Sequence, residues 1–182
     1  MIREKLLIFE REIIREVAIF SSLLTIAIVA PLFHFQPITG TIVNATLFLA
    51  TSLLGSSAAM LIGLIPSVVA LSVGLLPPVL APMIPFIMIS NTILVLVFGF
   101  FKNKSYWIGV LIASFLKFLF LFSTSSIVIN LLLKKDIALK VAQMMSWPQF
   151  LTALGGGVIA YLVLHSLFFL KKAYNKAQKN SS

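Results

Sequence analysis

The sequence predicts an all-α polytopic membrane protein, a single bundle of about six transmembrane helices that forms one domain over residues 1–182. Three observations support this prediction: hydrophobic residues make up 60% of the chain, charged residues make up only 10%, and the apolar residues fall into six long runs. Soluble domains normally contain about 25% charged residues, so the charge needed to solvate a globular surface is missing. A bilayer core about 30 Å thick requires about 20 apolar residues per helix, and this chain has room for about six such helices.

Apolar residues in the first segment, residues 1–16, recur at helical spacing between charged residues. This pattern predicts an amphipathic, cytoplasmic helix on the membrane surface that leads into the first span. The six apolar runs predict spans at about residues 13–33, 39–54, 58–75, 83–101, 106–133 and 149–170. Residues 171–182 form a basic cytoplasmic tail that we expect to be frayed.

Prolines mark several boundaries between these spans. Residues 34–40 are polar and contain Pro37, which predicts a turn after the first span. Pro66 falls inside the third span, where it should kink the helix. The run Pro77-Pro78-Val79-Leu80-Ala81-Pro82 predicts a stiff, extended loop, because so many prolines cannot all sit in an α-helix.

Lysine and arginine give the chain a formal net charge of +9, but these residues do not form one basic patch. Four precede the first span, two lie between the fourth and fifth spans, three between the fifth and sixth, and four follow the sixth. Such cations flank membrane spans on the cytoplasmic side. The pattern predicts a multi-pass plasma-membrane protein with both termini in the cytoplasm and with no nucleic-acid partner, although the three lysines before the sixth span do not fit this orientation.

The apolar runs lack the residue types that catalysis and cofactor binding require. The chain has no cysteine, which excludes disulfides, thiolate catalysis and Cys-bound zinc or iron–sulfur clusters. His34 and His165 each stand alone, without a carboxylate or a second histidine at ligand spacing. We therefore expect no enzymatic activity, no metal site and no cofactor.

Lys117 is the one ionisable residue deep inside a predicted span, near the middle of the fifth. No Asp or Glu lies between Glu16 and Asp136, so no acidic side chain within a span can neutralise it. A charge in hydrocarbon costs roughly 2.5–3.5 kcal/mol, so we expect the ammonium group to face a cavity and to meet backbone carbonyls, a water molecule or a substrate anion. The alternative is that the flexible side chain snorkels toward the membrane interface.

Uncharged polar residues inside or at the end of other predicted spans are candidates for the same site as Lys117. Three asparagines lie inside predicted spans: Asn44, Asn91 and Asn130. Two further polar residues lie at the mouth of the second span, and side chains of these kinds can match the donors and acceptors of a small ligand. The candidate substrate-binding residues are Gln36, Thr39, Asn44, Asn91 and Lys117. The alternative for each asparagine is a hydrogen bond between helices.

Small residues form two features that predict close helix contacts. A narrow face of the first helix follows the i, i+3, i+4, i+7 pattern and consists of Ala18, Ser21, Ser22 and Thr25. Such a stripe permits tight packing, either within the bundle or against a partner protein. The run Gly155-Gly156-Gly157 lacks the following Lys-Ser/Thr of a phosphate loop, and it predicts the close approach of a neighbouring helix.

The middle of the chain, roughly residues 30–100, resembles the substrate-binding S components of energy-coupling factor (ECF) transporters. The resemblance depends on the chain length, the six predicted spans and the short sequences Gln36-Pro37-Ile38-Thr39-Gly40, Val43-Asn44-Ala45, Leu53-Leu54-Gly55, Ile65-Pro66-Ser67, Ala81-Pro82-Met83-Ile84-Pro85-Phe86-Ile87 and Asn91. It implies a bundle that binds a vitamin-like or precursor molecule and delivers it by toppling in the membrane.

The resemblance also implies partners and roles for individual segments. The partners would be a transmembrane T component and two cytoplasmic ATPases, with the first helix as the contact for the T component. Ala18-x-x-x-Ser22 only approximates the Ala-x-x-x-Ala sequence of that contact. Residues 34–40 would form a lid over a pocket lined by the five candidate residues.

A second function is compatible with the same residues. The chain would then be a non-catalytic structural or assembly subunit of a larger membrane complex, such as a membrane oxidoreductase. In that case the polar residues inside the spans only pack helices together, and no ligand pocket is expected.

Overall fold

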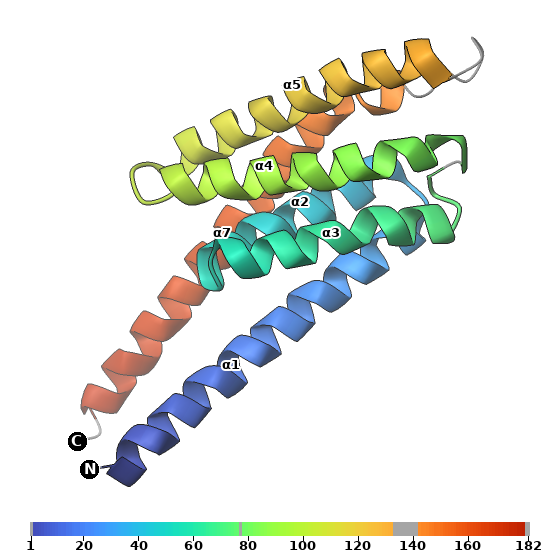
Figure 1. Cartoon of the computed structure of the whole chain (residues 1–182). Coiled ribbons are helices and arrows are strands. Elements are labelled where there is room, and N and C mark those ends of the chain that lie inside the picture. Colours follow the sequence, from blue (N-terminus) through green and yellow to red (C-terminus); the bar gives the residue numbers. More distant parts are fainter. Residues whose placement is uncertain (1, 77, 133–141, 181–182) are drawn as a thin grey trace.

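The computed structural model describes residues 2–76, 78–132 and 142–180. These residues form six long α-helices and two 3-10 helices, with no strand among them (Figure 1). In chain order the elements are α1 (Ile2–Val29), η1 (Ala30–Phe33), α2 (Gln36–Leu53), α3 (Ser56–Ser72), η2 (Pro78–Met83), α4 (Ile84–Phe101), α5 (Tyr106–Leu132) and α7 (Trp147–Asn180). The predicted all-α bundle of about six helices is confirmed.

Four stretches of the described residues are long and apolar enough to cross a membrane: Phe9–Phe33, Ala81–Phe101, Tyr106–Val128 and Ala142–Gln178. The other two helices, α2 and α3, have 18 and 17 residues. At about 1.5 Å per residue they approach the thickness of a bilayer core. Large apolar side chains such as Leu96, Leu111 and Leu162 are exposed on the outside of the bundle, as lipid contact requires. The chain is therefore a polytopic membrane protein.

Helix α2 lies at the centre of the bundle, where it contacts α1, α3, α4 and α7. Its residues from Val43 to Thr51 are all buried. The hydroxyl groups of Thr46 and Thr51 donate to the carbonyl oxygens of Ile42 and Leu47 in the same helix, at 2.9 and 2.7 Å. Because these polar groups are satisfied locally, α2 can be buried without unpaired hydroxyls.

The run Gly155-Gly156-Gly157 brings α7 against two helices at once. A Cβ atom on Gly156 would lie 2.6 Å from the backbone nitrogen of Ala45 in α2, and one on Gly157 would lie 2.4 Å from Val110 in α5. Only glycine fits at such distances. The predicted close approach is therefore confirmed, and the contact of Gly156 with α2 includes Asn44.

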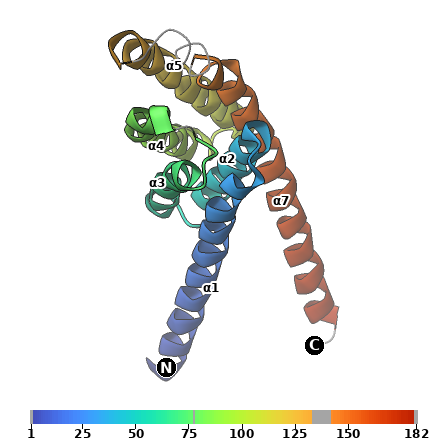
Figure 2. The same cartoon turned by 90° about the vertical axis from the view of Figure 1, so that its right-hand side faces the viewer.

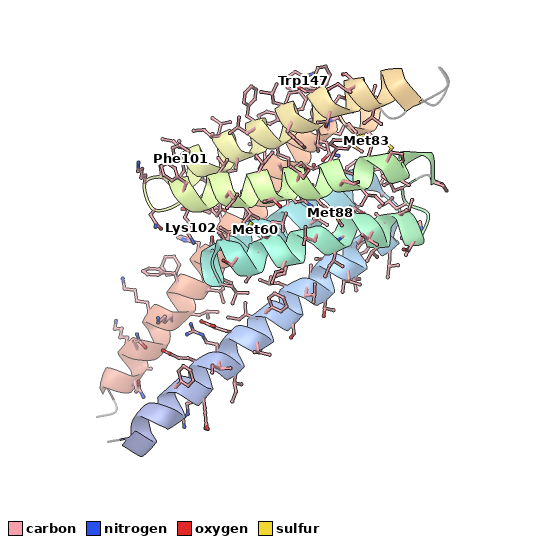
Figure 3. All side chains as sticks on the ribbon, in the orientation of Figure 1. Met60, Met83, Met88, Phe101, Lys102 and Trp147 are labelled. Atoms are coloured by element: carbon pink, nitrogen blue, oxygen red, sulfur yellow. The ribbon has the colours of Figure 1, made fainter. Side chains whose placement is uncertain are left out.

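Both termini lie at one end of the bundle, called here the terminal end. The first part of α1 and the last part of α7 extend past the other helices toward this end, and they diverge from one another in Figure 2. The opposite end carries η1, η2 and the beginnings of α2 and α4. Met83, directly before α4, lies at the opposite end of the bundle, and Lys102, directly after α4, lies at the terminal end (Figure 3).

Two predictions about loops are wrong. Residues 78–83 do not form an extended loop but the 3-10 helix η2, while Pro77 lies outside the described residues. Proline fixes φ near −65°, which a short 3-10 helix also adopts. The expected turn over residues 34–40 is limited to His34 and Phe35, because α2 begins at Gln36 with Pro37 in its first turn. Proline suits that turn, where its missing N–H would have no partner.

The helices at the two termini are longer than predicted. Helix α1 runs without a break from Ile2 through the first span, so residues 2–16 continue that helix, and their position on the membrane surface stays a prediction. Helix α7 continues to Asn180, so the expectation of a frayed tail from residue 171 is wrong for the described part of it. Straight-chain residues such as Lys171 and Lys172 favour helix even in an exposed segment. Helix α3 continues through Pro66 to Ser72.

Candidate functional site

A cavity of about 70 Å³ lies between the helices in the half of the bundle near the opposite end. Its lining comes from α2, α3, α4, α5 and the start of α7, together with Leu75, Leu76 and Met145. The five predicted substrate-binding residues, Gln36, Thr39, Asn44, Asn91 and Lys117, all line this one cavity. The structure therefore brings together residues from three helices that the sequence predicted separately.

Lys117 lies near the middle of α5, and its side chain is only 3% exposed. The ammonium nitrogen donates to Oδ1 of Asn44 at 2.6 Å and to Oδ1 of Asn91 at 2.7 Å. The side chain therefore does not snorkel to an interface, and that alternative is wrong. The partners also differ from the backbone carbonyls, water or anion that we expected, because two neighbouring helices supply amide oxygens instead.

The two asparagines are themselves held by second hydrogen bonds. Asn91 Nδ2 donates to the carbonyl oxygen of Gly63 in α3 at 2.8 Å, and Asn44 Nδ2 donates to Thr152 Oγ1 in α7 at 3.5 Å. Both asparagines are almost fully buried. The network therefore joins α2, α3, α4, α5 and α7 around one ammonium group, and each helix fixes part of its geometry.

Gln36 and Thr39, at the start of α2, have different surroundings from the buried network. Thr39 is buried, and its hydroxyl group donates to the carbonyl oxygen of Ala30 at 3.0 Å, which ties the start of α2 to η1. Gln36 is half-buried in the first turn of α2. Asn130 belongs to α5, but its side chain lies outside the part of the chain that the structure describes.

Two polar residues that line the cavity were not predicted from the sequence. Ser67 lines the cavity from α3, and its hydroxyl group lies 3.5 Å from the carbonyl oxygen of Leu64. Gln149 lines it from the first turn of α7, and its Nε2 donates to the carbonyl oxygen of Met144 at 3.0 Å. Gln149 is a polar residue directly after Pro148 at the start of an apolar run, which was a usable signal. Ser67 belongs to the short sequence Ile65-Pro66-Ser67 on which the family resemblance depends, and that was its signal.

His34 holds the connection between α1 and α2, which consists of η1 with His34 and Phe35 and is here called the lid segment. Of the lid predicted over residues 34–40, only His34 and Phe35 belong to this connection, because α2 begins at Gln36, and its role as a lid stays a prediction. The backbone of His34 adopts a left-handed conformation with φ of 53°. Ring atom Nδ1 lies 2.7 Å from the carbonyl oxygen of Leu32, and Nε2 lies 2.9 Å from that of Val73 at the end of α3. Since carbonyl oxygens only accept, a doubly protonated ring satisfies both contacts and a neutral ring satisfies one. His34 thereby fastens the lid segment to α3.

Replacing His34 by alanine should loosen the lid segment. The change removes the ring contacts to Leu32 and Val73, which together contribute about 1–2 kcal/mol, so we expect the backbone amides of residues 30–40 to exchange about tenfold faster or more. Hydrogen–deuterium exchange with mass spectrometry measures this rate. Phe35→Ala is the control, because Phe35 is 54% exposed and its removal leaves the His34 contacts intact. Equal exchange in the His34→Ala variant and the wild type would show that His34 does not hold the segment.

A second lysine joins helices at the terminal end of the bundle. Lys102, directly after α4, donates from Nζ to the carbonyl oxygen of Thr51 in the last turn of α2. Burial lowers the pKa of Lys102 below its usual value. The contact fits a cation at the negative end of a helix dipole, so Lys102 has a structural role that explains its burial.

The stripe of small residues on α1 faces outward. Ala18, Ser21, Ser22 and Thr25 are all exposed, so the interpretation that this face packs inside the bundle is wrong. The hydroxyl groups of Ser22 and Thr25 donate to the carbonyl oxygens of Ala18 and Ser21, each at 2.8 Å. Because the hydroxyl groups of Ser22 and Thr25 are satisfied within α1, these two residues can enter an apolar interface without becoming unpaired.

Comparison with known proteins places the chain in a family. Residues 15–168 match the family described as ECF transporter, substrate-specific component, which covers most of the chain. No curated protein and no solved structure matches the chain. The match includes all five predicted substrate-binding residues, and it agrees with the resemblance found in residues 30–100. This helical membrane protein belongs to the substrate-specific S components of ECF transporters.

Proposed function

We propose that this chain captures a small vitamin-like or precursor molecule in the Lys117 cavity and hands it to a T component driven by two cytoplasmic ATPases. The observation that supports the proposal most directly is a buried ammonium group at a cavity, held by two amide oxygens and, among the described residues, by no carboxylate. Burial of a charge without an opposite charge is unfavourable, and structural packing gives no reason for it. A bound ligand that interacts with the ammonium group would give a reason for burying it.

The charge distribution supports capture from outside the cell. Among the 14 Lys and Arg residues, four precede the first span, two follow α4 and four belong to the end of α7, which places ten at the terminal end. Three others lie between α5 and α7 in the sequence, and the last is Lys117. By the positive-inside rule the terminal end faces the cytoplasm. The cavity then lies in the outer half of the membrane, with the lid segment on the external side.

The outward-facing stripe on α1 is the proposed contact for the T component. Its residues are small and exposed, and the hydroxyl groups of Ser22 and Thr25 are satisfied within α1. Helices in lipid associate through such faces because small side chains allow their backbones to approach closely. The chain would reorient in the membrane on this contact and carry the cavity from the external to the cytoplasmic side.

Native mass spectrometry of the full chain, purified from membranes, tests the proposed function. We expect a population that carries one small molecule, which is released on denaturation and can be identified by its mass. The chain should also co-purify with the T component and the ATPases when these are expressed together. A chain that carries no small molecule and associates instead with the subunits of another membrane complex would support the structural alternative.

Replacing Ser22 by phenylalanine should weaken the contact with the T component without affecting the ligand. The larger side chain keeps the helices apart, and we expect association to fall by about tenfold or more. Co-purification of the T component with the tagged chain measures this effect. Leu111→Phe is the control, because Leu111 is exposed on α5, which does not belong to the stripe. Equal losses in both variants, or none in Ser22→Phe, would show that the stripe is not the contact.

A further inference from the structure

We propose, on the basis of the function proposed above, that the cavity is a receptor for a compact molecule with one anionic group, such as a carboxylate, on an apolar body. In this site Asn44 and Asn91 present hydrogen-bond donors to the ligand, together with Lys117. The evidence is the orientation of the two amides, the absence of a counter-charge, and the composition of the remaining lining.

The contacts of each asparagine fix which end of its amide faces Lys117. An amide can turn by 180°, which exchanges its oxygen and nitrogen. For Asn91 the exchange would place the NH₂ group against the ammonium, donor against donor, and the oxygen against the carbonyl oxygen of Gly63. Both contacts would become repulsive. Asn44 is fixed by the same argument at Lys117, where its Oδ1 accepts at 2.6 Å.

This orientation makes the centre of the cavity rich in donors. The ammonium group has three N–H donors, and among the described residues two of them have acceptors. Each NH₂ group has two donors, of which one is directed to Gly63 or Thr152. Since both amide oxygens are bound to the cation, the groups left for a ligand are mainly N–H donors. Such a set matches the acceptor oxygens of an anion.

The charge at this centre leads to the same ligand class. No Asp or Glu occurs from residue 17 to residue 135, so the helices around Lys117 contribute no negative charge. An anionic ligand would pair with the ammonium group in a region shielded from water, where the attraction is strong. A ligand with a positive charge would be repelled by the same group. The site therefore selects against amines as well as for acids.

The rest of the lining is mainly apolar, and its polar residues are Gln36, Thr39, Ser67 and Gln149. Its lining includes Val43, Pro66, Leu76, Ile87 and Met145, which offer no hydrogen bonds from their side chains. The cavity volume of about 70 Å³ is roughly half the ~150 Å³ of a cavity that holds benzene, so it leaves room for a molecule smaller than a benzene ring. A single anionic head at Lys117 with an apolar body between these side chains satisfies both parts of the lining.

Three small compounds with the same ethyl group test the inference: propionate, propionamide and propylamine, which are negative, neutral and positive at neutral pH. Binding to the purified full chain is measured by the shift of thermal unfolding with concentration. We expect propionate to bind about tenfold or more tightly than propionamide, and propylamine not to stabilise the protein. Stronger or equal binding of propionamide or propylamine would overturn the inference, and so would the absence of any propionate effect.

Asn44→Asp provides a sharper test with a matched control. The aspartate would place a counter-charge on Lys117, and it would lose both the long contact to Thr152 and the N–H donor proposed for the ligand, so propionate affinity should fall by about tenfold or more. Asn103→Asp makes the same change of charge on an exposed residue after α4, and it should leave the affinity unchanged. Equal affinities in Asn44→Asp and the wild type would contradict the role of the uncompensated ammonium group.

The outcome for the natural ligand separates this inference from the proposed function. A retained molecule that is neutral or cationic at neutral pH overturns the anionic class and leaves capture for transport standing. A retained anion supports both. A chain that retains and transports no molecule overturns the proposed function, and the anionic class fails with it.

Discussion

Replacing Lys117 by methionine is expected to abolish ligand retention while the protein still folds. Methionine is also unbranched and fills a similar volume, but it removes the ammonium group that donates to Asn44 and Asn91. The two amide oxygens lose their partner, which costs about 1–3 kcal/mol each, and a buried charge is removed, which compensates part of that cost. We expect the ligand affinity to fall by about 100-fold or more, because the charged contact is lost.

Mass spectrometry of the purified variant, compared with the wild type, measures the fraction of chains that carry the ligand. Lys104→Met is the matched control, since Lys104 is an exposed lysine whose Nζ lies 5.0 Å from the centre of the Phe100 ring. It should retain the ligand as the wild type does. A second control is Ser114→Ala, which removes a buried hydroxyl group without a hydrogen-bond partner among the described residues. Wild-type ligand occupancy in Lys117→Met would mean that the binding site lies elsewhere.

Among the variants proposed here, replacing Gly156 by alanine is expected to cause the largest loss of stability. The new Cβ atom would lie 2.6 Å from the backbone nitrogen of Ala45 and 2.7 Å from Cβ of Asn44, and neither atom can move without shifting α2. Overpacking of this kind costs about 1–3 kcal/mol, which corresponds to a midpoint of thermal unfolding lower by several degrees. One of the two atoms displaced is Cβ of Asn44, whose side chain accepts from Lys117, so ligand retention should fall as well.

Gly155→Ala is the control for this prediction. Its Cβ atom would lie 3.4 Å from Thr41 Cγ2, an ordinary contact distance. Alanine favours helix over glycine by about 1 kcal/mol, so this variant should be as stable as the wild type or more stable. Thermal unfolding in the same detergent compares the two. Equal midpoints for Gly155→Ala and Gly156→Ala would show that the contact between α7 and α2 is not tight.

Much of the fold followed from the sequence, because the cost of exposing polar groups to lipid acts on each segment separately. Six apolar runs predicted six helices, and the solitary charge in one of them singled out Lys117. Local rules failed where they allow more than one conformation. Proline is compatible with both an extended loop and a 3-10 helix, so the sequence of residues 78–83 did not distinguish η2 from a loop.

The sequence by itself determined that this is a helical membrane protein with a buried cation and polar side chains that its helices must accommodate. Only the tertiary structure decided how they are accommodated. Asn44 and Asn91 lie 73 and 26 residues from Lys117 in the chain, and they reach its ammonium group because α2 and α4 pack beside α5. The same packing leaves the small stripe of α1 outside. Such contacts depend on how the helices fit together, which no single segment specifies.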